Sequence, residues 1–153
     1  MKQARGTNQP GGLVTAAAAV IHDPAGRVLL IRQNYGQRRW GLPGGRINGG
    51  ETPVHAVIRE VRAETGLETR VVDMVGLYHL CGGGNGLPDQ LTYAFRCEVV
   101  GGEASVNLPG KVAQVAWHDP AALPSPTTAS VPIVVADSAA GLSGAVKDVV
   151  RPG

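Results

Sequence analysis

One segment, residues 45–67, constrains the fold of this 153-residue chain more than any other. It reads GRINGGETPVHAVIREVRAETGL. Thr52 followed by Pro53 is typical of a helix start, and Gly66 is typical of the residue just past a helix end. Between them, apolar residues recur at the three- and four-residue spacing of one helix face: Val54, Val57, Ile58 and Val61. The segment therefore predicts a helix over 53–65 with this face buried.

Two carboxylates on the predicted helix suggest a metal site. Glu60 and Glu64 are four residues apart, so they lie one turn apart on a face beside the apolar stripe. In a bare helix such a pair repels mildly, and a hard divalent cation between them would reverse that cost. An isolated pair of this kind is usually an ordinary surface feature. Only the register with other residues of the segment favours a site for Mg²⁺, with Mn²⁺ as a possible substitute.

Six residues at fixed spacing give the segment its identity: Gly45, Glu51, Arg59, Glu60, Glu64 and Gly66. Their spacing resembles the Nudix box, the signature of hydrolases that cut nucleoside diphosphates linked to another group. The preceding residues 40–45 look like the usual lead-in to that box, and a weaker resemblance continues to about residue 123. One box position differs, because Ala63 stands where the family has a glutamate.

The resemblance implies an α/β fold, the Nudix-type α/β/α sandwich with a mixed β-sheet. It implies divalent-metal-dependent hydrolysis of a pyrophosphate linkage in a nucleotide-type substrate. Glu60 and Glu64 would be catalytic and hold the metal, together with the backbone carbonyl of Gly44. Arg59 and Glu51 would form an ion pair that orients the metal-binding glutamates.

Residues just before the helix are candidates for substrate contact: Arg39, Trp40, Gly45 and Arg46. Arginine pairs well with phosphate oxygens, and Trp40, like Tyr78, offers a ring on which a base could stack. A solvated basic loop is an equally good interpretation of Arg39, whereas the box places Arg46 near the site. Substrate choice would depend mainly on loops 34–39 and 81–89.

Two other functions stay open. The glutamate replaced by Ala63 contributes to the metal cluster in the family, and no acid precedes the predicted strand that ends at Trp117, where Lys111 stands instead. Glu98 and Glu103 are the remaining candidates for a downstream acid. A catalytically weak or inactive Nudix-like nucleotide-binding module is therefore the main alternative. Isomerase chemistry on a diphosphate ester is a third, and it would need a cysteine or an extra acid facing the pocket.

The rest of the chain predicts one α/β domain over residues 13–140, after a flexible tail over 1–12. Expected strands cover 13–21, 27–33, 69–80, 90–100 and 111–118, and a final helix covers 128–139. The first two strands are expected to join through a hairpin turn at residues 22–26. Residues 141–153 form a C-terminal extension that fits a helix, a strand or a tail, and its apolar residues could pack on a second copy in a homodimer.

Composition excludes several classes of protein. A net charge of +2 is too small for general nucleic-acid binding. Two cysteines make neither a disulfide framework nor a zinc site, which favours a reduced, cytoplasmic setting. The N-terminus lacks the apolar stretch of a secretory signal, and the apolar run 13–21 is too short to span a membrane. The run 13–21 is better explained as a buried strand.

Overall fold

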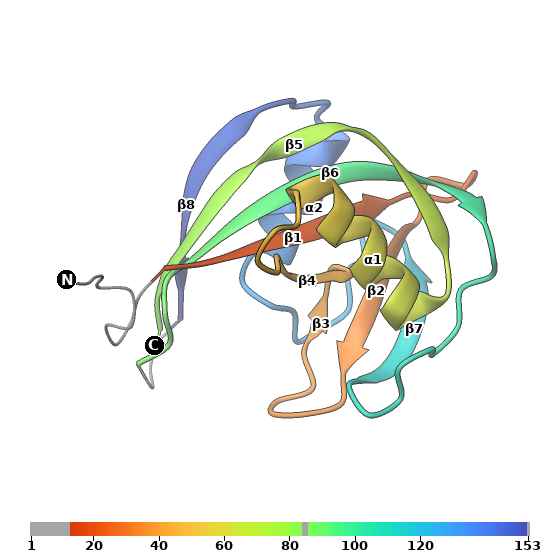
Figure 1. The fold of residues 1–153 in the computed structure, drawn as a ribbon, viewed down its shortest axis with the longest axis horizontal. Coiled ribbons are helices and arrows are strands. Elements are labelled where there is room, and N and C mark those ends of the chain that lie inside the picture. The colour runs from red at the N-terminus through yellow and green to blue at the C-terminus, as the bar shows by residue number, and fades with distance from the viewer. Residues whose placement is uncertain (1–12, 84–85, 153) are drawn as a thin grey trace.

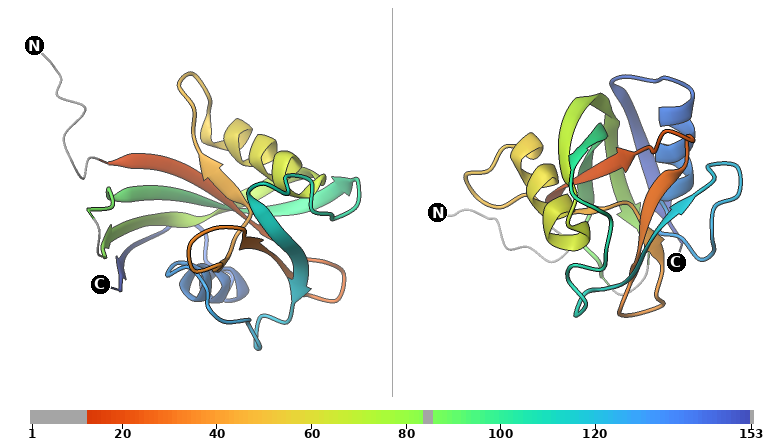
Figure 2. Two further views of the ribbon diagram at one scale, coloured as in Figure 1. Left: turned by 90° about the horizontal axis from the view of Figure 1, so that it is seen from below. Right: turned by 90° about the vertical axis from the view of Figure 1, so that its right-hand side faces the viewer.

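The computed structural model describes residues 13–83 and 86–152, which form two β-sheets and two helices (Figure 1). In chain order the elements are β1 Val14–Ile21, β2 Val28–Gln33, β3 Trp40–Gly41, β4 Gly44–Arg46, α1 Pro53–Thr65, β5 Glu68–Gly82, β6 Gln90–Gly101, β7 Val112–His118, α2 Val131–Ala139 and β8 Ala145–Arg151. Helices α1 and α2 lie on opposite sides of the larger sheet (Figure 2). The predicted α/β/α sandwich with a mixed sheet is confirmed.

The larger sheet has the strand order β4-β1-β6-β5-β8. β1 runs parallel to β6 and antiparallel to β4, whereas β5 runs antiparallel to β6. Alternate residues of β1 face opposite layers: Ala19 and Ile21 pack in the cluster under α1, and Val20 packs in the cluster that contains α2. Since both faces are covered there, β1 is apolar from Ala16 to Ile21.

The smaller sheet has the order β3-β2-β7 and is antiparallel. The expected hairpin turn is present, with an antiparallel bridge between His22 and Val28, but β1 and β2 do not pair beyond it, because they enter different sheets. A tight turn is present: Asp23 accepts hydrogen bonds from the backbone N–H groups of Ala25 and Arg27. This turn passes the chain from the larger sheet to the smaller one, and the chain returns to the larger sheet at β4, which pairs with β1.

Helix α1 has the predicted bounds, and its ends use the predicted residues. The Thr52 hydroxyl accepts a hydrogen bond from the backbone N–H of His55, and Gly66 ends the helix with a φ of 76°. The expected stripe is confirmed for Val57, Ile58 and Val61, which pack in the core, but Val54, in the first turn, is 41% exposed. The buried face also includes Ala56, Glu64 and Thr65. Packing therefore starts in the second turn and includes a carboxylate.

The C-terminal residues complete the larger sheet. β8 pairs parallel with β5, from Gly76 opposite Ala145 to Gly82 opposite Arg151. Of the three conformations that the sequence left open for this segment, the strand is the one adopted. Helix α2 begins at Val131, three residues later than expected, because the backbone N–H of Thr128 bonds to the carbonyl of Trp40 in β3.

Strand β5 extends slightly beyond the predicted range 69–80, with irregular pairing to β6 between Val71 and Asp73 and between Met74 and Gly76. Such irregularities bend a strand without ending it. In the described part of the chain, neither helix has the length and apolar character needed to cross a membrane.

Candidate active site

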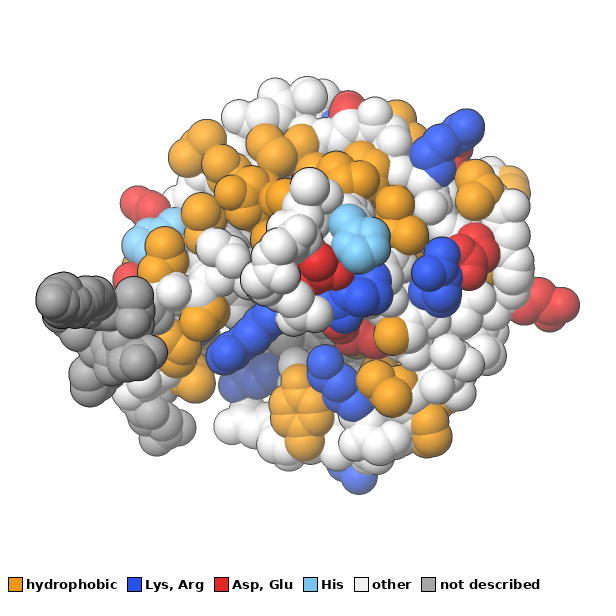
Figure 3. All heavy atoms as spheres, viewed as in Figure 1, with side chains coloured by type: hydrophobic (Ala, Val, Ile, Leu, Met, Phe, Trp, Pro, Cys, Tyr) orange, Lys and Arg blue, Asp and Glu red, His pale blue; other side chains and the backbone are white. Residues whose placement is uncertain are grey.

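A cleft of about 960 Å³ opens between the two sheets, and Glu60 and Glu64 lie on its wall. Its lining comes from β1, the Gly44–Arg46 strand β4, helix α1, the residues before β7 and the end of β8. On the face drawn in Figure 3, Lys and Arg side chains gather around a hollow. Four cationic residues line the cleft, namely Arg39, Arg46, Lys111 and Arg151. A cleft of this kind suits a ligand with several negative charges.

Two glycines let the chain approach α1 closely. A Cβ atom on Gly45 would lie 2.5 Å from Oε1 of Glu60, so a side chain there would take the place of this carboxylate. A Cβ atom on Gly44 would collide with the backbone of Ala17 in the neighbouring strand β1. The Gly44 backbone N–H donates a hydrogen bond of 2.9 Å to Oε1 of Glu64. The glycine turn and the two glutamates therefore form one packed unit.

Arg59 connects the loop before α1 to the site. Its Nε and Nη2 atoms donate to the two carboxylate oxygens of Glu51, at 2.6 and 2.9 Å. Its Nη1 atom donates to Oε2 of Glu60 at 2.6 Å, and Nη2 also reaches the carbonyl of Arg46. The hydrogen bonds from Arg59 lower the pKa of Glu51 to about 2. The ion pair implied by the family resemblance is thus present, and Arg59 extends it to Glu60.

Glu64 is almost completely buried, with 1% of its surface exposed. Burial raises the pKa of its carboxyl group to about 7, and the nearby negative charge of Glu60 acts in the same direction. The hydrogen bond from Gly44 and the positive charge of Lys111 oppose this rise. Glu64 therefore belongs to the packed face of α1 and not to the neighbouring face expected from the sequence. A cation beside it would favour its charged form.

The residues present fit a hard divalent cation. Oε2 of Glu60 and Oε1 of Glu64 accept hydrogen bonds from Arg59 and Gly44. Within the described residues, Oε1 of Glu60 and Oε2 of Glu64 accept none, which leaves one oxygen of each carboxylate available. No group of three His, Cys, Asp or Glu side chains with metal-ligand geometry occurs in residues 13–83 and 86–152. Two carboxylates suffice for Mg²⁺, which commonly takes its other ligands from water and substrate phosphates.

The predicted substrate contacts divide into two groups. Arg39, Gly45 and Arg46 line the cleft. Trp40 does not appear in this lining: it is 7% exposed and packs edge-on against His118, at 4.8 Å between ring centroids. Tyr78 is fully buried, and its hydroxyl donates to Asp137. The prediction that a base stacks on Trp40 or Tyr78 is therefore wrong, because both rings fill the core.

Lys111 is a site residue that the sequence did not indicate. Its Nζ atom lies 3.9 Å from Oε1 of Glu60 and 4.0 Å from Oε2 of Glu64. Arg151 is another: it lines the cleft and donates to the carbonyls of Gly82 and Pro88. Neither residue lies in a motif, and each reaches the cleft through pairing between distant segments.

A family model described as the NUDIX domain matches residues 12–136, which include the cleft carboxylates and the glycine turn. The chain belongs to the Nudix hydrolase family. Enzymes of this family act on phosphorus-containing anhydrides.

Relatives of this Nudix chain carry several different names. A MutT-like protein of Streptomyces ambofaciens is 35% identical over 96 residues, which are 63% of this chain and 58% of the relative. An ADP-ribose pyrophosphatase of Methanocaldococcus jannaschii is 31% identical over 96 residues, which are 58% of this chain and 53% of the relative. The chain thus spans little more than half the length of these two curated relatives.

A solved structure with the same fold is the MutT Nudix hydrolase from Burkholderia pseudomallei. It aligns with a TM-score of 0.76 at 25% identity, covering 82% of this chain and 97% of the other. The family model ends at residue 136, so β8 and Arg151 lie outside the matched segment.

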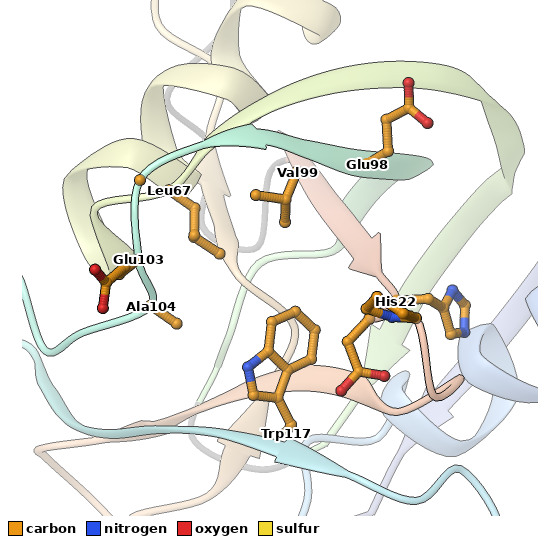
Figure 4. A pocket seen from close by; sticks show the side chains of 10 residues that line it. His22, Leu67, Glu98, Val99, Glu103, Ala104 and Trp117 are labelled. Carbon is orange, nitrogen blue, oxygen red and sulfur yellow. The ribbon is translucent and has the colours of Figure 1, made fainter.

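In this Nudix domain, neither candidate for a downstream acid reaches the cleft. Glu98 and Glu103 line a second hollow of about 650 Å³, in which Glu103 lies on one side, Glu98 and His22 lie on the other, and Trp117 lies between them (Figure 4). This hollow shares no lining residue with the cleft. Glu98 is also paired with Arg70. The expectation that one of these acids completes the metal site is therefore wrong, because β6 and the loop after it carry them to another part of the surface.

The cysteines also lie outside the described lining of the cleft. Cys97 is buried in the core under α1, where burial raises the pKa of its thiol to about 12. Cys81 is half-buried on β5, with its sulfur 3.9 Å from the carbonyl of Val149. The isomerase hypothesis required a cysteine or an extra acid facing the pocket, and these positions give it no support.

Proposed function

We propose that this domain is a divalent-metal-dependent nucleotide pyrophosphohydrolase, which cuts the pyrophosphate linkage of a nucleoside diphosphate joined to another group. The observation that carries the proposal is the pair of available oxygens, Oε1 of Glu60 and Oε2 of Glu64, on a cleft with a cationic rim. A diphosphate and a divalent cation satisfy both parts of this arrangement, because the phosphates meet the cationic side chains and the cation meets the carboxylates.

In this proposal Glu60, Glu64 and the carbonyl of Gly44 hold Mg²⁺, which Mn²⁺ can replace. When bound, the metal polarises the phosphate and lowers the cost of attack by water. Arg59 and Glu51 fix the carboxylate of Glu60, and the Gly44 N–H fixes that of Glu64. Glu60 and Glu64 are the acids among the described residues of the cleft, so the base that accepts the proton of the attacking water is one of them.

Arg39, Arg46 and Gly45 are assigned to substrate phosphates and the sugar next to them. The floor of the cleft beyond β4 is built of small and uncharged side chains from adjacent strands, including Ala16, Ala18 and Thr92. This floor leaves room for a flat or ring-shaped group at the other end of the substrate. The names of the relatives, among them an ADP-ribose pyrophosphatase and an RNA pyrophosphohydrolase of Mannheimia succiniciproducens, define the compounds to test first.

The test is a panel of nucleoside triphosphates, nucleotide sugars, ADP-ribose, dinucleoside polyphosphates and 5′-triphosphate RNA, each with Mg²⁺ or Mn²⁺. Phosphate is measured after adding a phosphatase, and Glu64→Gln protein runs in parallel. Turnover that requires metal and falls at least about a hundredfold in Glu64→Gln supports the proposal. Equal turnover by the variant, or turnover without metal, contradicts it.

The second candidate function is a nucleotide-binding module with weak or no hydrolysis. Ala63 and the position of Lys111 favour it, since one carboxylate of the box is missing and a cation stands beside the other two. A binding module would be stabilised by one compound of the panel without metal and would leave every compound intact. Clustered carboxylates argue against this alternative, because they weaken the binding of an anion unless a cation is present.

Homodimer formation and a cytoplasmic setting remain predictions from the sequence. The outer face of β8 carries two strongly exposed apolar residues, Val146 at 78% and Val150 at 74%. Sedimentation velocity of the purified protein would test the homodimer directly.

A further inference from the structure

Lys111 stands between the two carboxylates of the candidate metal site. Its ammonium group is about equally far from Oε1 of Glu60 and Oε2 of Glu64, at 3.9 and 4.0 Å. These are the two oxygens that Arg59 and Gly44 leave available. Lys111 therefore lies next to the atoms that would bind a metal, and its positive charge attracts both of them without a direct hydrogen bond.

The backbone around Lys111 is tied to its surroundings on both sides. Before it, the backbone N–H of Asn107 bonds to the Glu64 carbonyl, and the Asn107 side chain bonds to the carbonyls of Arg62 and Ala63. At Lys111 itself, the carbonyl accepts a hydrogen bond from Asn34, next to β2. The end of α1 and the end of β2 thus fix the base of this side chain opposite the carboxylates.

The side chain itself retains freedom. It is 49% exposed, whereas the side chains of Glu60 and Glu64 are 12% and 1% exposed. Lysine carries a compact charge on a flexible four-carbon stem, so its ammonium group can move several ångströms while the backbone stays in place. A divalent cation at the same two oxygens would strongly repel an ammonium group about 4 Å away. The contact of Lys111 with the carboxylates and the presence of a metal are therefore mutually exclusive.

We propose that Lys111 competes with the divalent cation for Glu60 and Glu64, and that it turns to a substrate phosphate when the cation is held. This inference rests on the proposed function and adds to it a residue that contacts the substrate. In the metal-free protein Lys111 relieves the repulsion between the two carboxylates and lowers the affinity of the site for metal. With metal present its charge is released within the cleft, where the other cations face the same substrate.

The first test measures Mn²⁺ binding to the purified protein by electron paramagnetic resonance, without any substrate. Lys111→Gln removes the competing charge and keeps a side chain of similar length. We expect it to bind Mn²⁺ about tenfold more tightly than the wild type. Lys111→Arg keeps a cation and should retain the weaker affinity. Arg39→Gln is the matched control, because it removes a charge from the same cleft without contact to either carboxylate, and it should change affinity less than about twofold.

Equal Mn²⁺ affinity in the wild type and Lys111→Gln overturns the proposal, as does an equal gain in Arg39→Gln. Thermal unfolding without and with Mn²⁺ checks that each variant is folded. The Lys111→Gln protein should be stabilised more than the wild type by the same Mn²⁺ concentration. This second readout keeps the comparison valid if the metal-free variant is slightly less stable.

The substrate half of the proposal is tested at saturating Mn²⁺ on a compound that the wild type hydrolyses. Lys111→Gln should raise KM severalfold and change kcat less, because the lost contact is with bound phosphate. An unchanged KM overturns this half. Failure of the proposed function is recognised separately: if the panel contains no substrate, Mn²⁺ binding still decides whether Lys111 competes for the site.

Discussion

Arg59 holds Glu51 with two of its nitrogens and Glu60 with a third, so one guanidinium group joins the loop before α1 to a carboxylate of the candidate metal site. Planar bidentate contact of this kind is specific to arginine. The consequence is that Glu51, which does not itself line the cleft, controls where the carboxylate of Glu60 points.

Replacement of Glu51 by Gln should therefore impair the site from outside it. The variant keeps the size of the side chain but removes the charge that orients Arg59. We expect a tenfold to hundredfold loss, roughly, in Mn²⁺ affinity or in kcat/KM. The matched control is His55→Gln: His55 lies 3.0 Å from the same carboxylate, but its side chain is 67% exposed. Equal losses in the two variants would show that any contact of Glu51 matters, and not the one with Arg59 in particular.

Gly45 gives a second way to move Glu60 without changing it. Because a Cβ atom at this position would lie 2.5 Å from Oε1 of Glu60, Gly45→Ala should displace the carboxylate and reduce turnover by about a hundredfold. Gly49→Ala is the control, since nothing lies within 4 Å of its Cβ position. That variant should keep full turnover and a similar unfolding temperature. Normal turnover in Gly45→Ala would mean that the position of Glu60 is not critical.

The missing glutamate of the box can be restored. Ala63 lies next to Glu64 on α1, and Ala63→Glu adds a carboxylate at the position where the family has one. We expect Mn²⁺ to bind several times more tightly to this variant, because another negative charge is placed close to the site. Ala63→Gln has nearly the same shape without the charge and should bind Mn²⁺ like the wild type. The same affinity in both variants would mean that residue 63 does not face the metal.

A prediction for stability concerns Asp137, which accepts hydrogen bonds from the buried Tyr78 hydroxyl and from Lys147, each at 2.8 Å. Asp137→Ala leaves the Tyr78 hydroxyl without its partner and should lower the free energy of unfolding at neutral pH by about 1–3 kcal/mol. Urea unfolding measures this loss. Asp148→Ala is the control, since the Asp148 side chain is 79% exposed, and it should cost less than about 0.5 kcal/mol.

The contribution of Asp137 to stability should also depend on pH. The hydrogen bond from Lys147 is the main reason that the pKa of Asp137 lies below its usual value of 3.8. Its charged form therefore stabilises the fold fully above the unfolded-state pKa, and this contribution is lost as pH falls through the lower folded-state value. The stability difference between the wild type and Asp137→Ala should shrink in acid. A constant difference from pH 7 to about pH 2 would contradict this explanation.

Local signals explain how much of the fold could be predicted. The bounds of α1 follow from Thr52 and Gly66, which act on backbone groups within a few residues of themselves. The separation of β1 and β2 into two sheets depends on strands far along the chain, and a turn sequence carries no information about it. Likewise the conformation of residues 145–151 is decided by the exposed edge of β5, on which they pair.

The residues of the candidate site also divide into those placed by local sequence and those placed by distant segments. Glu51, Arg59, Glu60 and Glu64 were recognisable because they share one helix and the loop before it, so their spacing fixes their geometry. Lys111 was not recognisable, since its distance from the carboxylates depends on how Asn107 and its neighbours attach to the end of α1. Trp40 was misassigned because an aromatic residue beside a glycine turn has the same sequence pattern whether its ring faces the cleft or the core.

The pairing of β8 with β5 has a consequence for the order of folding. Gly82 and Arg151 are 69 residues apart in sequence, yet Arg151 bonds to the Gly82 carbonyl at the mouth of the cleft. Contacts across so many residues form slowly, because a long loop must close before they contribute. The helix and glycine turn that hold the carboxylates are local and can form early. We therefore expect Glu51, Arg59, Glu60 and Glu64 to come together before β8 completes the wall that shapes the cleft around a ligand.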